Sequence, residues 1–302
     1  MFAVLLVALL GMAALVIDVG TMWQARRNLV TATDAGALAA AQEYAIGGTG
    51  CATVAADFYG RNAPPDADAP TCSTAGQTVT VAGNVDVPFT FGRALGLTDG
   101  AITASTTALW QQPYSVSGLR PLGLCLDMLT AQGATPPVLG QTVHVPWNND
   151  GPDTCSNGGS GNNIPGNWGY IDFDNTAGNP NNQISDWTAN GYPDAVAPGI
   201  FDPFTGAHNN IANDLTPLIG QCITLPIYTK AEGNGGNAEF TIVDFASVIL
   251  TDVHFTGQQN ARYFEFTWAS CLVQGSGEGG GIDYGPKTIR ICDVDNSAQN
   301  RC

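Results

Sequence analysis

The N-terminal end of the chain is an apolar segment that carries no charge. Residues 1–17 read MFAVLLVALLGMAALVI, and Asp18 is the first charged residue. In an α-helix, seventeen residues extend about 25 Å, which is near the lower limit for crossing the apolar core of a bilayer. The segment therefore predicts a helix that is covered either by lipid or by other apolar helices.

This helix is expected to continue well beyond its apolar start. The sequence from Asn28 to Ile46, NLVTATDAGALAAAQEYAI, contains no proline, and the first helix-breaking pair is Gly47-Gly48. We therefore predict one helix over residues 1–46, about 65 Å long. The segment is interpreted as a membrane anchor or the core of a filament.

Small residues recur at every fourth position in the second half of this helix. Ala32, Gly36 and Ala40 share one face, and that spacing lets two helices approach closely. One interpretation places this face against sister helices in an assembly. The alternative is an alanine-rich helix that packs on its own domain.

Asp18 interrupts the apolar stretch, where a carboxylate is costly and normally has a partner or a function. Two interpretations remain open. Asp18 either lies at the membrane edge in contact with headgroup water, or pairs with Arg26 or Arg27 of a neighbouring helix and sets the axial register. No basic residue precedes the apolar run, which is opposite to the positive-inside arrangement, so a basic leader before Met1 is expected in the precursor.

The first 45 residues resemble the N-terminal segment of TadE/TadG-like proteins of tight-adherence (Tad/Flp-type) pilus systems. The resemblance rests on an apolar stretch, an Ile-Asp-Val-Gly step, an aromatic residue, an arginine pair and a small-residue helix. These positions are Ile17, Asp18, Val19, Gly20, Trp23, Arg26, Arg27, Asp34, Ala35, Ala37, Leu38 and Ala39. Gly36 departs from the usual alanine, and Leu5 stands where major type IV pilins carry a glutamate.

The resemblance implies a structural subunit of an extracellular, pilus-like filament. Its partners would be copies of itself in a helical filament and the pilus-assembly machinery of the cytoplasmic membrane, through which it passes to the cell surface. Burial of apolar side chains between copies would hold the filament together, with the assembly helix represented by Leu5, Leu6, Leu9 and Leu10. The alternatives are a membrane-anchored minor assembly protein that does not polymerise, or an anchored carbohydrate- or calcium-binding adhesin.

The remaining sequence predicts an α+β protein with an oxidised head. Residues 47–113 combine a short helix with alternating strands, two of them over residues 77–83 and 84–91, and a helical turn within PFTFGRALGL. Residues 114–302 form a β-rich head domain of antiparallel strands, with one strand over residues 119–129 and a long hairpin on both sides of AEGNGGN. The eight cysteines include no C-x-x-C pair, which favours disulfides of an exported protein over a zinc site. The pairings expected are Cys51–Cys72, Cys125–Cys155, Cys222–Cys271 and Cys292–Cys302.

Charge and motifs exclude several functional classes. The net charge of −16 offers no basic patch for nucleic acid or for anionic lipid headgroups. The three histidines, His144, His208 and His254, are far apart in sequence, and Ser160 and Ser276 do not fit G-x-S-x-G. The chain is therefore not expected to be an enzyme or to need a cofactor.

Calcium is the one ion for which the sequence offers ligands. Acidic loop residues supply hard oxygen atoms, and the candidates are Asp172, Asp174, Asp293 and Asp295. None of these loops fits the spacing of an EF-hand, so ordinary Asx turns are favoured.

Overall fold

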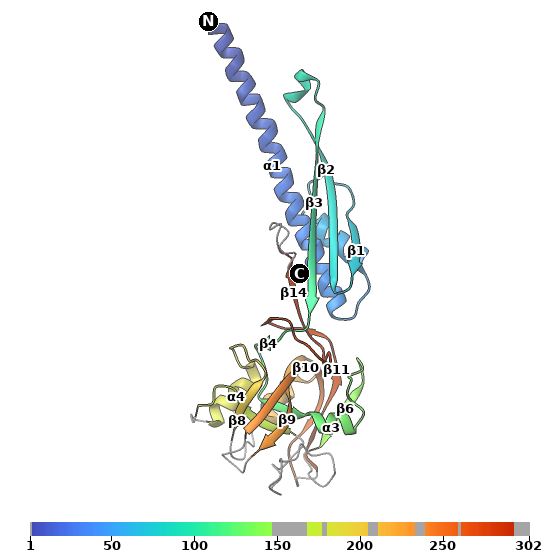
Figure 1. Cartoon of the computed structure of the whole chain (residues 1–302), viewed down its shortest axis with the longest axis vertical. Helices are drawn as coiled ribbons and strands as arrows, with labels where there is room; N and C mark the ends of the chain where they lie inside the picture. Colours follow the sequence, from blue (N-terminus) through green and yellow to red (C-terminus); the bar gives the residue numbers. More distant parts are fainter. Residues whose placement is uncertain are drawn as a thin grey trace. The chain divides into compact units, whose positions relative to one another are not determined.

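The computed structural model describes residues 2–146, 168–176, 180–204, 211–232, 239–258 and 261–292. The chain forms two compact units (Figure 1). Unit 1 comprises Met1–Trp110 together with Ile289–Cys302, and unit 2 comprises Gln111–Thr288. The long helix and the small α+β module, expected as separate segments, therefore belong to one unit. The mixed α+β class with a long N-terminal helix and a β-rich part is as predicted.

Unit 1 is a long helix packed on a small antiparallel sheet. Its elements are α1 (Phe2–Ala45), α2 (Cys51–Gly60), β1 (Thr71–Ala75), β2 (Thr78–Pro88), η1 (Gly92–Leu95) and β3 (Asp99–Gln111). The strands lie in the order β1-β2-β3, and β14 (Pro286–Ile291) follows β3, where the chain re-enters unit 1. Figure 1 shows β2 and β3 as a long hairpin that runs beside α1.

The core of unit 1 lies between α1, α2 and the sheet. Strand β2 alternates buried and exposed residues, so that Val79, Val81 and Val85 face the helices. Leu29 and the small residues of α1 cover these valines. Thr106 of β3 also donates a hydrogen bond to Asp34 of α1, with 2.6 Å between the oxygens. The second half of α1 is therefore held by apolar packing and by a polar contact with β3.

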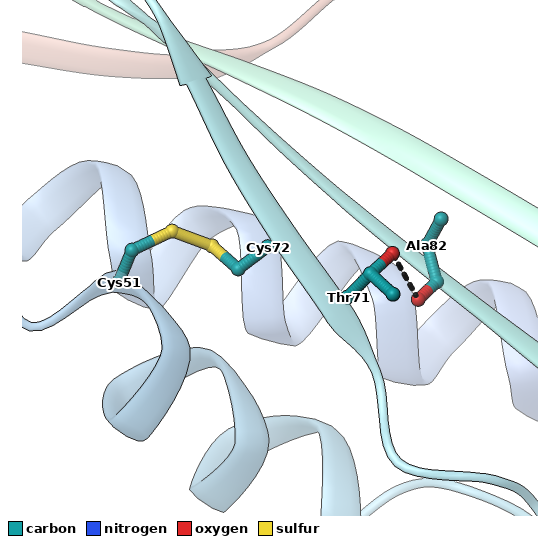
Figure 2. The surroundings of a disulfide bond; sticks show 4 residues. All are labelled: Cys51, Thr71, Cys72 and Ala82. Carbon is teal, nitrogen blue, oxygen red and sulfur yellow. Dashed lines mark hydrogen bonds between the residues drawn. A yellow bond between two sulfur atoms is a disulfide. The ribbon is translucent and has the colours of Figure 1, made fainter.

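A disulfide joins α2 to the edge strand of this sheet. Cys51 is the first residue of α2 and Cys72 lies in β1, with 6.1 Å between their Cα atoms (Figure 2). Next to it, the Thr71 hydroxyl donates to the carbonyl of Ala82 in β2 at 3.4 Å. The short edge strand is thus tied covalently to the helical layer and by hydrogen bonds to β2.

Unit 2 is built around a seven-stranded sheet in the order β6-β11-β10-β8-β7-β5-β9. An additional pairing of β9 with β10 closes five of these strands into a ring. The strands are β5 (Leu122–Cys125), β6 (Thr142–Pro146), β7 (Trp168–Asp172), β8 (Gly199–Pro203), β9 (Cys222–Glu232), β10 (Glu239–His254) and β11 (Tyr263–Trp268). Their pairings are antiparallel except for β5 with β9, which is parallel.

Shorter elements complete unit 2. They are β4 (Ser115–Val116), α3 (Leu126–Ala131), α4 (Pro180–Asn190), α5 (Ile211–Leu215), η2 (Thr216–Leu218), β12 (Cys271–Leu272) and β13 (Gly275–Ser276). The core is apolar and aromatic. Tyr228 of β9 meets Phe240 of β10 edge to face, with 4.9 Å between ring centroids, and both side chains are fully buried. The same cluster of buried side chains extends from Leu124 of β5 to Phe266 of β11.

Two local predictions differ from the structure. The sequence predicts two strands over residues 77–91, but β2 runs unbroken through Gly83. A Cβ atom at Gly83 would lie 2.3 Å from the Tyr59 hydroxyl, so this glycine makes room for a buried aromatic ring instead of marking a turn. The strand predicted over residues 119–129 ends at Cys125, where α3 begins.

Candidate functional site

The carboxylate of Asp18 binds the tip of the β2–β3 hairpin. Its Oδ1 accepts the backbone N–H of Thr90 at 2.8 Å, and its Oδ2 accepts those of Phe91 at 3.1 Å and Gly92 at 2.7 Å. Only 8% of Asp18 is exposed. Three N–H donors converging on one carboxylate stabilise its ionised form and offset the cost of taking it out of water.

This contact gives Asp18 a partner that the sequence did not indicate. Its partner is the backbone at residues 90–92, and no salt bridge joins it to Arg26 or Arg27 in the part of the chain that the structure describes. This is an attachment within unit 1, and a pair with an arginine of a neighbouring helix stays a prediction. Asp18 fixes the hairpin tip to the helix.

Apolar packing supports the attachment. Gly100 at the start of β3 lies under Met22 of α1 and Phe89 of the hairpin. A Cβ atom there would be 2.7 Å from Met22 Cε and 3.0 Å from Phe89 Cζ. Thr21, next to Met22, donates its hydroxyl to the Asp18 carbonyl at 2.8 Å. The glycine thus lets the helix and the hairpin approach closely just beside the carboxylate.

An exposed apolar surface surrounds this point. We call it the N-terminal apolar surface. Its members are Met12, Leu15, Val16, Ile17, Val19 and Trp23 of α1 with Phe91 and Leu97 of the hairpin tip, and each is at least 45% exposed. A groove of about 410 Å³ runs between the helix and the tip, lined mainly by apolar side chains. An exposed apolar surface of this kind marks a site of contact with another apolar body.

Basic residues lie close to this surface. Arg26 and Arg27 are exposed one turn beyond Trp23, and the Arg27 guanidinium lies 5.8 Å from the centre of the Trp23 ring. Arg93 belongs to η1 in the hairpin tip. The chain is acidic as a whole, yet this end of unit 1 combines apolar and basic side chains.

The predicted small-residue face of α1 is used inside unit 1. Ala32 and Ala40 are fully buried in its core. A Cβ atom at Gly36 would lie 3.1 Å from the carbonyl oxygen of Ala55 in α2 and 3.3 Å from Val81. The interpretation of these residues as a contact between sister helices is therefore wrong within this fold, and the alternative of packing on the helix's own domain is correct.

The remaining assembly residues are placed only in part. Leu5, Leu6, Leu9 and Leu10 belong to α1, but their side chains lie outside the described residues. Over the part of the chain that is described, no helix combines the length and apolarity needed to cross a membrane.

The structure also bears on the cysteines. Cys222 and Cys271 are bonded in unit 2, with 6.6 Å between their Cα atoms, so two of the four expected pairings are present. Cys125 and Cys292 are disulfide-bonded as well. Cys155 and Cys302 lie outside the described residues, so the other two pairings stay predictions.

The acidic candidates for calcium form a turn. Asp174 Oδ1 accepts the Thr176 amide at 2.9 Å, and its Oδ2 accepts the Gln183 side chain at 2.6 Å. Burial raises the pKa of Asp172 to about 7, and a hydrogen bond to Asp174 contributes. Among the described residues no three acidic, histidine or cysteine side chains form a metal-binding group. Asp293 and Asp295 lie outside those residues, and calcium binding stays a prediction.

Two of the histidines, distant in sequence, flank the same ring. The His144 ring lies 4.7 Å and the His254 ring 5.6 Å from the centre of Tyr263. His144 Nδ1 also lies 2.8 Å from Glu265 Oε1 on the exposed edge of the sheet. His208 lies outside the described residues.

The site on α1 coincides with the part of the chain that has known relatives. Residues 1–43 match the Flp pilus-assembly TadE/G-like family. The TadE/G-like resemblance seen in the sequence is thus confirmed over this segment. The match ends two residues before α1 does and includes Asp18, while the hairpin tip and unit 2 lie outside it. No curated protein and no solved structure shows significant similarity to the chain.

Sequence reasoning missed the partner of Asp18. The residues concerned are Thr90, Phe91 and Gly92, whose backbone rather than side chains makes the contact. The available signal was the segment PFTFGRALGL between two strands, because aromatic and aliphatic residues are unusual at the exposed tip of a hairpin.

Proposed function

We propose that this protein is a structural, non-enzymatic subunit of an extracellular filament of the Flp/Tad pilus type, assembled through α1. The family match ties its N-terminal segment to Flp/Tad pilus assembly. After passage through the cytoplasmic membrane, copies of the chain polymerise by covering one another's N-terminal apolar surface. Unit 2 is then available for surface contacts or adhesion.

The division of α1 into two parts carries this proposal. From Leu29 to Ala45 the helix buries one face in the core of unit 1, whereas from Met12 to Trp23 its large apolar side chains, apart from the half-buried Met22, are exposed. Covering a leucine or valine side chain stabilises an assembly by about 1.5–3 kcal/mol. Several such side chains on each copy are enough to hold a polymer without covalent links.

The attachment of the hairpin tip suits this role. It fixes Phe91 and Leu97 beside the helix through Asp18, so that each copy offers a preformed apolar surface instead of a bare helix. A preformed surface loses less conformational entropy on assembly. Arg26 and Arg27 beyond Trp23 can then contact acidic groups of a neighbouring copy, since the chain as a whole is acidic.

The Leu15→Asp variant tests the proposal. Leu15 is 66% exposed in unit 1, so the substitution should leave the fold intact and prevent filaments from forming. Gln24→Asp introduces the same side chain at an exposed polar position of the same helix and should leave filament yield unchanged. The measurement is the amount of this protein in sheared surface filaments, seen by electron microscopy and quantified by immunoblot. Normal filaments from the Leu15→Asp variant would refute assembly through this surface.

A second candidate is a membrane-anchored minor protein of the same pilus system that does not polymerise. It is favoured by the position of Phe89 and Phe91, which already line one flank of α1 and leave fewer sides free for neighbouring helices. In that case wild-type protein would be found with the membrane fraction and would be scarce in sheared filaments.

A further inference from the structure

The tip of the β2–β3 hairpin, residues 89–98, exposes apolar side chains where a turn usually presents polar ones. Phe91 is 45% and Leu97 55% exposed. Figure 1 shows the tip at the same end of unit 1 as the N-terminal part of α1. The groove between them follows α1 from Met22 to Gly11, which is about 16 Å of helix. The tip therefore extends the apolar surface of α1 over about three helical turns.

The backbone of the tip is paired inside unit 1. At least seven of its ten N–H groups have an acceptor there. Three donate to the Asp18 carboxylate, and those of residues 89, 94, 96 and 97 donate to carbonyl groups of the tip itself. A turn in water does not need such pairing, because water satisfies its amides. Lipid offers no partner, so a backbone that contacts lipid has to be paired within the protein, and the tip largely meets this condition.

The charges at this end of unit 1 are opposite to those of the chain as a whole. Residues 1–33 and the tip together carry three arginines and a single acidic residue, Asp18, which is buried against the tip. The arginines are all exposed and are Arg26, Arg27 and Arg93. The next acidic residues lie further along α1 and at the base of the hairpin, and are Asp34, Asp86 and Asp99. The net charge of −16 therefore does not describe this end, where positive charges border an apolar surface.

Apolar, aromatic and basic residues follow one another along this surface in the order that a membrane interface requires. From Asp18 the groove continues to Gly11, about 10 Å of helix, and interfacial elements lie about 5–10 Å deep in a bilayer. Trp23 lies on the other side of Asp18, with the Arg27 guanidinium 5.8 Å from the centre of its ring. Tryptophan and arginine are typical of the boundary between acyl chains and headgroups.

We propose that the hairpin tip is a second membrane-contacting element beside α1. Before assembly, Phe91 and Leu97 insert among the acyl chains, and Arg93 at the tip contacts the phosphates of anionic lipid headgroups. The planar donors of a guanidinium match a phosphate. Lipid therefore supplies acidic partners at this surface, whereas the same surface of a second copy presents arginines of its own. The proposal rests on the part of the proposed function that brings the chain to the cytoplasmic membrane, and it does not require polymerisation.

The test is photo-crosslinking of the full chain with p-benzoylphenylalanine in place of Phe91. The chain is reconstituted at low density in phosphatidylcholine vesicles, with and without phosphatidylglycerol, and mass spectrometry after illumination identifies adducts with lipid or with a second copy. The matched control carries the same residue in place of Phe58 in α2, which is 41% exposed. Lipid adducts should be at least about fivefold more frequent at position 91, because acyl chains cover an apolar side chain there.

A second variant tests the contact with headgroups. Arg93→Gln should lower the yield of lipid adducts at position 91 in phosphatidylglycerol vesicles by up to about fivefold, and should change it little in pure phosphatidylcholine. Arg61→Gln removes another exposed arginine of unit 1, one that is paired with Asp57 in α2, and should have no effect.

Three results would overturn the proposal. These are equal yields of lipid adducts at positions 91 and 58, adducts at position 91 with a second copy in place of lipid, or equal effects of Arg93→Gln and Arg61→Gln. If the chain with the crosslinking residue at position 91 does not fold, as judged by circular dichroism, position 97 takes its place, since Leu97 is 55% exposed. The outcome is independent of the filament experiment: normal filaments from Leu15→Asp would refute assembly through this surface, and lipid adducts at position 91 would still be expected.

Discussion

The Asp18 carboxylate accepts a hydrogen bond of 2.7 Å from the backbone amide of Gly92, which lies 74 residues further along the chain. The same carboxylate binds the amides of Thr90 and Phe91. An acidic residue next to an apolar segment thus has a structural role that needs no second molecule. It turns α1 and the hairpin tip into one apolar surface.

Substitution of Asp18 should release the hairpin tip. Asn has one acceptor oxygen in place of two, so Asp18→Asn leaves at least one of the three amides without its partner. Hydrogen exchange at residues 90–92 should become several times faster, while exchange in the β2–β3 ladder stays unchanged. Asp86→Asn, at an exposed position of β2, is the control and should have no effect on the tip. Unchanged exchange at residues 90–92 in Asp18→Asn would contradict the role of this contact.

The buried hydroxyl of Thr106 should matter for the docking of α1. It donates to Asp34 and lies 2.9 Å from the Thr33 hydroxyl. Thr106→Val removes both contacts at nearly constant volume and should destabilise unit 1 by about 1–3 kcal/mol. Thr103→Val makes the same change at an exposed position of β3 and should alter stability by no more than about 0.5 kcal/mol. Urea unfolding followed by hydrogen exchange in α1 peptides measures both, and equal effects would argue against the buried contact.

Close approach at Gly36 makes a further prediction. Gly36→Leu places a side chain where Ala55 and Val81 already lie within 3.1–3.3 Å of the Cβ position. Overpacking of this kind costs about 1–3 kcal/mol or more. Gly20→Leu is the matched control, because Gly20 has no atom within 4 Å of its Cβ position. It should raise the helix content, since leucine favours helix over glycine by up to about 1 kcal/mol. Thermal unfolding by circular dichroism separates the two, and equal stability would contradict the packing.

The sequence predicted those helices and strands that are determined by residues close to one another in the chain. The alternation on both sides of AEGNGGN predicted a hairpin, and its two strands, β9 and β10, pair antiparallel, with Glu239 opposite Glu232. The helical turn predicted within PFTFGRALGL is η1. A long uninterrupted α1 follows from the absence of proline. In each case a residue's neighbours in sequence are also its neighbours in space.

Features that depend on distant residues could not be read from the chain. Asp18 meets residues 90–92 only because the β2–β3 hairpin is long enough to reach it. That length depends on β2 continuing through Gly83. In the sequence Gly83 resembles a strand break, and only its contact with Tyr59 explains the glycine. The small residues of α1 left two packing partners open, and only the contact with α2 decided between them.

Lowering the pH should stabilise unit 2, because two of its carboxyl groups have raised pKa values in the folded state. Burial raises the pKa of Asp172 to about 7 and that of Asp244 to about 6. In the unfolded chain both titrate near 3.9. At a pH between the unfolded-state pKa and the folded-state pKa of these carboxyl groups, the folded state therefore binds more protons than the unfolded state. The stabilising effect is complete below about pH 4 and is lost as the pH rises to about 7.

Asp172→Asn isolates this effect from the self-repulsion of an acidic chain. Asn resembles the protonated carboxyl and can still donate to Asp174, so the variant should be more stable than the wild type at pH 8, by about 1–3 kcal/mol. Near pH 4 the difference should largely disappear. Glu239→Gln removes one negative charge at an exposed position of the same unit, and it should change stability little at either pH. The measurement is urea unfolding at pH 4, 6 and 8, followed in unit 2 peptides by hydrogen exchange. A gain in Asp172→Asn that is the same at all three pH values, or one matched by Glu239→Gln, would mean that a buried, protonated Asp172 is not the cause.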